Sequence, residues 1–206
     1  MSLSSSTAER LLITSRRLFA EHGYAGASVR QITARAHANL GAVTYHFGSK
    51  EQLYQAVLES IVEPLAARMV AAAEIDRPPL DRIEQLIRAF FDHFLEHPDF
   101  PQFMTQMLAQ SGPFPPPVAH TQGVLRDAFL RTIEAGQRDG SIRSGPPLLL
   151  ALNVIAQPVY VALARRAIVQ VTGVDPADPA VREQIIHEVV AFARRGLAAG
   201  TGDTPT

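Results

Sequence analysis

The sequence predicts an all-α fold. Apolar residues recur at helical spacing along most of the chain, and clusters of Gly and Pro separate these stretches. No segment shows the alternation of apolar and polar residues that is typical of a half-buried strand. Hydrophobic residues make up 47% of the 206 residues, enough for a packed core. We therefore expect helices packed in one mid-sized domain, or in a small domain followed by a larger one.

Three helices are expected near the N-terminus. Leu11, Leu18 and Phe19 lie at helical spacing in the first, which Gly23 stops. Ser28 is a good N-cap for the second, and Asn39 can cap the third. The second and third helices are expected over residues 29–36 and 40–47.

Longer helices are expected in the rest of the chain. Gly48 and Ser49 break the third helix, and Asp76 to Pro79 form the clearest linker. Pro158 is expected to kink the helix that contains it. The expected helices cover residues 50–73, 80–96, 99–111, 117–139, 147–172 and 178–198.

The second and third short helices, joined by the three-residue turn 37–39, have helix-turn-helix spacing. Val29, Ile32 and Ala36 share one face, and the small Ala36 lets the two helices approach closely. Val43 and Phe47, four residues apart, anchor the third helix to the same core. The outward side chains are then free to enter a DNA major groove: Leu40, Gly41, Thr44, Tyr45 and His46.

This stretch closely resembles the TetR family of regulators over residues 7–60. The first helix ends in LFAEHGY, residues 18–24, which fits the family pattern L-F-x-x-x-G-Y. Ser28, Ile32 and Ala36 match next, then YHFGSK at residues 45–50 and Leu53. The form NLGAVTYHFGSK, residues 39–50, looks like the CecR-type subgroup.

The resemblance implies a surface for double-stranded operator DNA. Lys50 would meet a phosphate at a helix N-terminus, and the hydroxyls of Thr44 and Tyr45 can bond phosphates as well. The residues at matching positions are Ser28, Arg30, Gln31, Asn39, Leu40, Gly41, Ala42, Thr44, Tyr45, His46 and Lys50.

The sequence departs from the family pattern at two of these positions. His37 stands in the turn where the family commonly has glycine. Histidine tolerates left-handed backbone geometry better than most residues, so the turn is expected to survive. Thr44 stands where many members have tyrosine, which leaves the details of base reading open.

Charge and resemblance together suggest two domains and a disordered tail. Residues 1–58 hold six basic and three acidic side chains, whereas the remainder holds 13 basic and 17 acidic ones. A basic N-terminal part fits a nucleic-acid footprint, although an excess of three charges is small. We expect a helix-turn-helix domain at 1–50, an effector-binding and dimerisation domain at 51–200, and a disordered tail at 201–206.

The resemblance implies that the C-terminal domain binds a small effector and forms a homodimer through its last two helices, whose apolar faces are too broad for one protomer. The effector would be hydrophobic or amphipathic, and its binding would release the operator. Phe and Met residues concentrate over 90–107 and can form either plain core or an adaptable pocket. The predicted pocket residues are Arg88, Phe91, Phe94, Phe103, Met104, Met107, Asn153 and Gln157.

Two other function classes compete with this interpretation. His93, Glu96 and His97 spell H-x-x-E-H, an inverted zinc-peptidase motif, but Pro98 ends the helix and no strong third ligand stands out. An architectural DNA binder without a ligand would have a filled core between the Phe and Met helices. With no cysteine, no G-x-S-x-G motif and no P-loop, we expect neither an enzyme nor a bound metal or cofactor.

The expected location is the cytoplasm, without membrane contact. The N-terminus is small and polar, unlike a secretory signal. The longest apolar stretch, residues 148–164, is interrupted by Asn153, Gln157 and Pro158, which favours a buried helix over a membrane span.

Overall fold

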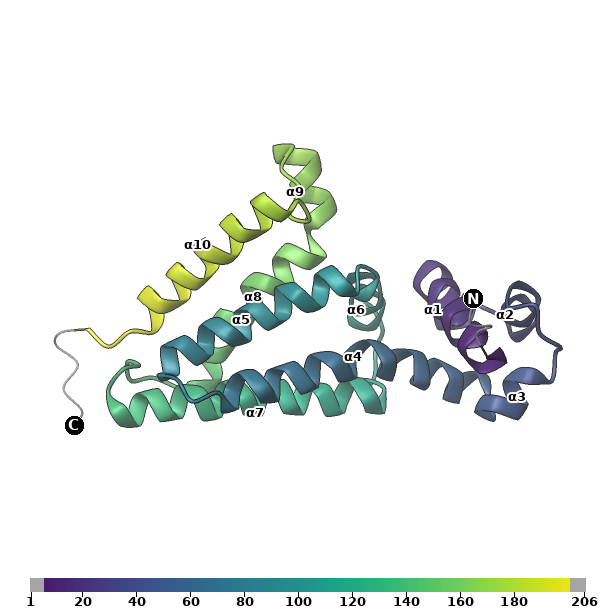
Figure 1. Cartoon of the computed structure of the whole chain (residues 1–206), viewed down its shortest axis with the longest axis horizontal. Helices are drawn as coiled ribbons and strands as arrows, with labels where there is room; N and C mark the ends of the chain where they lie inside the picture. The colour runs from purple at the N-terminus through teal and green to yellow at the C-terminus, as the bar shows by residue number, and fades with distance from the viewer. Residues whose placement is uncertain (1–5, 201–206) are drawn as a thin grey trace, which may run out of the picture. The chain divides into compact units, whose positions relative to one another are not determined.

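A computed structural model describes residues 6–200 of the chain and confirms the all-α fold (Figure 1). Within these residues the regular elements are all helices, and one isolated antiparallel bridge joins Ile142 to Ala198. The helices are α1 (Thr7–Gly26), α2 (Val29–Arg35), α3 (Ala42–Phe47), α4 (Lys50–Glu74), α5 (Pro79–Glu96), α6 (Phe100–Leu108), α7 (Pro116–Asp139), α8 (Pro147–Leu163), α9 (Arg165–Thr172) and α10 (Pro179–Leu197).

The chain forms two compact units. Of the described residues, the head unit comprises 6–63 and 102–119, and the body unit comprises 64–101 and 120–200. Helices α4, α6 and α7 each contribute residues to both units. The domain boundary expected at residue 50 coincides with the start of α4 and remains a prediction, and the expected tail at 201–206 lies outside the described residues.

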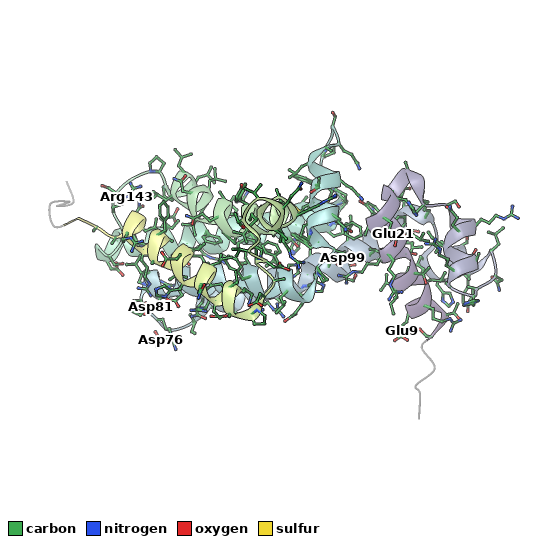
Figure 2. The ribbon with its side chains drawn as sticks, turned by 90° about the horizontal axis from the view of Figure 1, so that it is seen from above. Glu9, Glu21, Asp76, Asp81, Asp99 and Arg143 are labelled. Carbon is green, nitrogen blue, oxygen red and sulfur yellow. The ribbon has the colours of Figure 1, made fainter. Side chains whose placement is uncertain are left out.

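The first two helices begin with reciprocal side-chain caps. The Ser6 hydroxyl accepts from the backbone N–H of Glu9, and the Glu9 carboxylate, labelled in Figure 2, accepts from the backbone N–H of Ser6. Ser28 and Gln31 form the same arrangement at the start of α2. Gly23 has φ +71° and kinks α1 near its predicted end, a conformation that glycine adopts without strain.

The core of the head unit is built from α1, α2, α3 and the first half of α4. Leu11, Phe19 and Ile32 are completely buried there. Phe19 and Tyr54 meet edge to face, with ring centroids 5.0 Å apart. The amide Nε2 of Gln106 on α6 donates to the backbone oxygens of Phe19, at 3.3 Å, and Ala20, at 2.9 Å. Helix α6 is therefore hydrogen-bonded to α1 within this unit.

The body unit packs the second half of α4 together with α5, α7, α8 and α10 around one apolar cluster that includes Met69, Phe90 and Phe129. At its edge Arg194 pairs with Asp81, labelled in Figure 2, and with Glu84. Burial alone would raise the pKa of Glu84, but hydrogen bonds from Arg88 and Arg194 outweigh it and hold that pKa below its usual value. The network joins α5 to α10.

The single helix expected over 147–172 is two helices, so that prediction is wrong. The axes of α8 and α9 differ by 69°. The bend between the two helices is visible in Figure 1. The bend lies at Ala164, whose ψ of 3° leaves the helical range, and not at Pro158, which lies inside α8. Beyond the bend, Arg165 pairs with Asp175 in the loop that follows α9. The third helix also starts later than expected, at Ala42.

Among the described residues, no single helix is long and apolar enough to span a membrane; α8 and α9 pass that test only when they are joined across their bend.

The loop after α7 is held against the end of α10. The backbone N–H of Arg143 donates to the Leu197 oxygen at 2.8 Å, and its Nε donates to the Gly196 oxygen at 2.7 Å (Arg143 is labelled in Figure 2). The side chain of Ile142 lies directly on Gly136: a Cβ at Gly136 would be 2.5 Å from the Ile142 Cδ1 and 2.9 Å from its Cβ. Glycine is therefore required there for close approach.

Candidate nucleic-acid interface

The turn between α2 and α3 has the expected backbone geometry. His37 has φ +52°, the one positive φ of a non-glycine residue among the described part of the chain, which confirms that histidine adopts the left-handed conformation here. The Ala38 N–H donates to the Thr33 oxygen at 2.9 Å, and the Ala42 N–H to the Asn39 oxygen at 3.0 Å. These bonds fix where α3 starts relative to α2.

Helix α3 has one buried and one exposed face. Val43 is buried against the core that contains Ile32 and Ala36, as the spacing predicts. On the other side of α3, Tyr45 is 84% exposed, and Leu40, in the turn just before the helix, is 64% exposed. The other predicted residues of α3 and the turn before it that are exposed are Asn39, Gly41, Thr44 and His46; Ala42, by contrast, is buried.

Arg10 of α1 is hydrogen-bonded to the end of α2, next to the turn that leads to α3. Its Nε donates to the Ala36 backbone oxygen at 3.2 Å, and its Nη2 to the Thr7 hydroxyl at 3.2 Å. Arg10 lines an open hollow of about 550 Å³ together with His37, Asn39, Tyr45 and His46. Sequence reasoning counted Arg10 only as a charge, because nothing in its own helix shows that it reaches the turn.

The predicted residues of α2 combine structural and exposed positions. Ser28 and Gln31 cap the helix, and the Ser28 hydroxyl also lies 2.8 Å from the Gln31 Oε1. Arg30 is exposed on the first turn of α2. A DNA contact of these three residues stays a prediction.

Lys50 makes a contact that the sequence did not reveal. Its ammonium donates to the Tyr24 backbone oxygen and lies 4.3 Å from the centre of the Tyr24 ring. Partial burial lowers the pKa of Lys50 from its ordinary value. An ammonium has three donors, so this contact leaves capacity for a phosphate. The Ser49 hydroxyl accepts from the Gln52 N–H at 3.1 Å, which caps the start of α4.

The predicted pocket residues are separated by the fold. Phe91 and Phe94 line a cavity of about 100 Å³ in the body unit. Arg88 pairs with Glu84 and Glu183. The other predicted residues do not line that cavity: Phe103 and Met107 are buried in the head unit, Met104 is half-buried there, Asn153 is exposed and Gln157 is half-buried. Sequence reasoning missed Leu95, Pro98, Pro101, Arg165 and Arg182, which do line it.

The H-x-x-E-H segment lies at the end of α5. His93 is buried, and its ring centre is 4.5 Å from that of His97. Glu96 is exposed and pairs with Arg68 of α4. Within residues 6–200, no group of three or more His, Asp or Glu side chains is placed to hold a metal ion.

Two family descriptions match the chain. Residues 11–57 match the bacterial regulatory proteins of the tetR family, and residues 79–192 match the tetracyclin repressor-like C-terminal domain. The second match alone covers more than half of the 206 residues.

Relatives and solved structures agree with these matches. The chain is 28% identical over 196 residues to the HTH-type transcriptional repressor NicS of Pseudomonas putida, covering 93% of this chain and 92% of that protein. It is 29% identical over 146 residues to the repressor AcnR of Corynebacterium diphtheriae, covering 68% and 70%.

Among solved structures, a tetR-family regulatory protein from Rhodococcus RHA1 has a similar fold, with a TM-score of 0.74 and 21% identity over 96% of this chain and 100% of that one. The ketosteroid regulator KstR2 of Mycobacterium tuberculosis gives a TM-score of 0.72 at 21% identity, covering 95% and 97%. The protein therefore belongs to the TetR family of bacterial regulatory proteins, which are DNA-binding transcription regulators.

Proposed function

We propose that the protein is a ligand-responsive repressor that leaves its operator when a small effector binds the body unit, and that it acts in the cytoplasm as a homodimer. The observation that carries the DNA-binding half of this proposal is the exposed face of α3. Tyr45 and His46 lie on this face and Leu40 in the turn just before it, and a buried Val43 and the bonds of that turn fix their backbone. A rigid short helix that presents its N-terminal turns suits major-groove contact.

The residues of the interface divide into two roles. Thr44, Tyr45 and Lys50 carry hydroxyl or ammonium donors, which suit the phosphates of the DNA backbone. Leu40 and His46 are exposed, and we propose that they contact base edges, where an apolar group can meet a thymine methyl. The subgroup of the family stays a prediction.

Apolar exposure on α8 and α10 supports the homodimer. Leu148, Leu152 and Tyr160 are exposed along α8, and Phe192 is exposed on α10. Apolar side chains spread along two helices are typical of an interface with a second copy. Two-fold symmetry would then present two recognition helices at a fixed spacing, which a palindromic operator matches.

The release step is proposed to run through α6. Pro98, in the loop before α6, and Pro101, in its first turn, line the body cavity, whereas Gln106 farther along α6 bonds to α1. An effector that favours a different position of Pro101 would therefore displace α6 and loosen its hold on α1. This requires that the effector bind the two states with different affinity.

A fluorescence-anisotropy titration tests the proposed DNA binding. The probe is the DNA that flanks the protein's own gene, at two salt concentrations, with unrelated DNA as competitor. Tyr45→Ala should weaken specific binding about 10-fold or more, the order expected for one lost hydrogen bond to a charged group. Because Tyr45 is almost fully exposed, the Tyr45→Ala variant should have the same thermal stability as the wild type.

Leu108→Ala is the matched control, because Leu108 is also an exposed apolar residue of the head unit but lies on α6. It should bind DNA as the wild type does. Equal affinity of the Tyr45 variant and the wild type would refute the proposed docking face, and binding that the competitor or the higher salt erases would refute sequence-specific repression.

A further inference from the structure

The body cavity combines an apolar lining with two cations. It lies among α5, α8 and the loops around α9, and nine of its eleven lining residues are apolar. Phe91 and Phe94 contribute rings from α5, and Val161 contributes from α8. The other two lining residues are Arg165 and Arg182, and the lining contains no carboxylate. A site of this composition favours a ligand with an apolar body and a negative charge.

The two guanidinium groups are not equivalent. Arg165 is matched by Asp175 in a bidentate pair, with N–O distances of 2.8 and 2.9 Å. Arg182 is only 18% exposed, and its carboxylate neighbour Glu183 lies 3.8 Å away, more than half exposed and shared with Arg88 at 3.5 Å. Arg182 is therefore the cation whose charge is least compensated at the cavity.

One atom of Arg182 also lacks a hydrogen bond. Its Nε is completely buried and donates to no acceptor among the described residues. A buried donor on a charged group is costly to leave unsatisfied, and such a group commonly marks the place of a bound ion or water. Because Arg182 lines the cavity, its guanidinium group is the charged donor available to a ligand oxygen there.

The size of the cavity limits the ligand. Its volume is about 100 Å³ and it is partly open to solvent. An apolar protein cavity of about 150 Å³ holds one benzene molecule. The apolar body of the ligand is therefore no larger than one ring or a short branched chain.

We propose that the effector is a small monocarboxylate with a compact apolar body, held by Arg182 through a charge-assisted hydrogen bond. The role of this ligand as an effector rests on the proposed function, whereas its binding at Arg182 does not. A single negative charge suits a site in which one guanidinium already has its own carboxylate.

Isothermal titration calorimetry on the full-length protein tests the proposal with two probes of similar shape, benzoate and benzyl alcohol. We expect benzoate to bind at least about 10-fold more tightly, as one hydrogen bond to a charged group provides. Arg182→Gln should abolish that preference, and Arg182→Lys should restore part of it because the charge is kept. Arg195→Gln, which removes an exposed arginine of the same helix, should leave the preference unchanged.

The inference would be overturned by no binding of benzoate at millimolar concentration, by equal binding of the two probes, or by an unchanged preference in Arg182→Gln. Circular dichroism shows whether each variant is folded. If Arg182→Gln does not fold, the benzoate preference of Arg182→Lys decides the test. Phenyl phosphate binding more tightly than benzoate would also refute the choice of a monocarboxylate.

A parallel anisotropy titration separates this inference from the proposed function. If benzoate binds in an Arg182-dependent manner and the protein still holds its DNA, the cavity assignment stands and the release mechanism fails. If the protein binds no specific DNA at all, the repressor proposal fails while the calorimetry still decides the cavity.

Discussion

Two glycines of the same helix should respond oppositely to alanine. In α7, a Cβ at Gly123 would meet nothing within 4 Å, whereas one at Gly136 would lie 2.5 Å from two side-chain atoms of Ile142 and 2.9 Å from a third, its Cβ. Alanine stabilises a helix interior by about 0.5–1 kcal/mol relative to glycine, so Gly123→Ala should gain that amount. At Gly136 the same gain is opposed by overpacking, which costs about 1–3 kcal/mol.

The cost at Gly136 is hard to avoid because Ile142 has little freedom to move. A rotamer change shifts the outer atoms of Ile142 but not its Cβ, and the bridge to Ala198 holds its backbone. We therefore expect Gly136→Ala to be about 1–3 kcal/mol less stable than Gly123→Ala. For a chain of this size that is a difference in melting temperature of about 2–12 °C.

Thermal unfolding followed by circular dichroism, at one fixed protein concentration, measures this difference. Ile142→Ala should lower the stability less on the Gly136→Ala background than in the wild type, because it removes two of the three clashing atoms. If the two alanine variants melt at the same temperature, the close approach of Ile142 to Gly136 is refuted.

Three more predictions follow from the contacts described. Lys50→Met should lower both the melting temperature and DNA affinity, and should reduce the slope of log affinity against log salt by about 1; an unchanged slope would exclude a phosphate contact. The side chain of Asp175 should titrate at about 2 by NMR, because the hydrogen bond from Arg165 lowers its pKa from 3.8, and Arg165→Gln should return it towards 3.8. Since that pKa is lowered in the folded state, the Arg165–Asp175 pair contributes to folding stability above about pH 4, and this contribution is lost as pH falls through about 2. Phe192→Glu should raise the Kd of the proposed dimer by about 100-fold or more, since a two-fold interface loses the buried Phe192 side chain of both copies. Val171→Glu on α9 should leave that Kd unchanged. Light scattering that finds both variants dimeric would place the interface elsewhere.

The helix-turn-helix was predictable because its signals are local. The spacing of Ile32, Ala36 and Val43 selects one face, and the structure buries all three. The cap at Ser28 and the left-handed turn at His37 depend on residues within a few positions of each other. Such features are determined before any distant part of the chain is considered.

The surroundings of the cavity were not predictable in the same way. Phe91 and Phe103 look alike in sequence, but the first lines the body cavity and the second is buried in the head unit, because the chain passes from one unit to the other within α6. Helical periodicity shows that a face is apolar and does not show which neighbour covers it. Arg165 and Arg182 line the same cavity, and Arg165 follows directly after the bend at Ala164, a position that no proline or glycine marks.

The return of α6 to the head unit has a consequence for folding during synthesis. Residues 102–119 belong to the same compact unit as residues up to 63, so that unit lacks a part until its distant segment has been made. At a synthesis rate of about 5–20 residues per second, the delay is roughly 3–11 seconds. During that time the carbonyls of Phe19 and Ala20 have no Gln106 to bind. The head unit is therefore completed only after residues 64–101 of the body unit have been synthesised, although α1 to α3 leave the ribosome first.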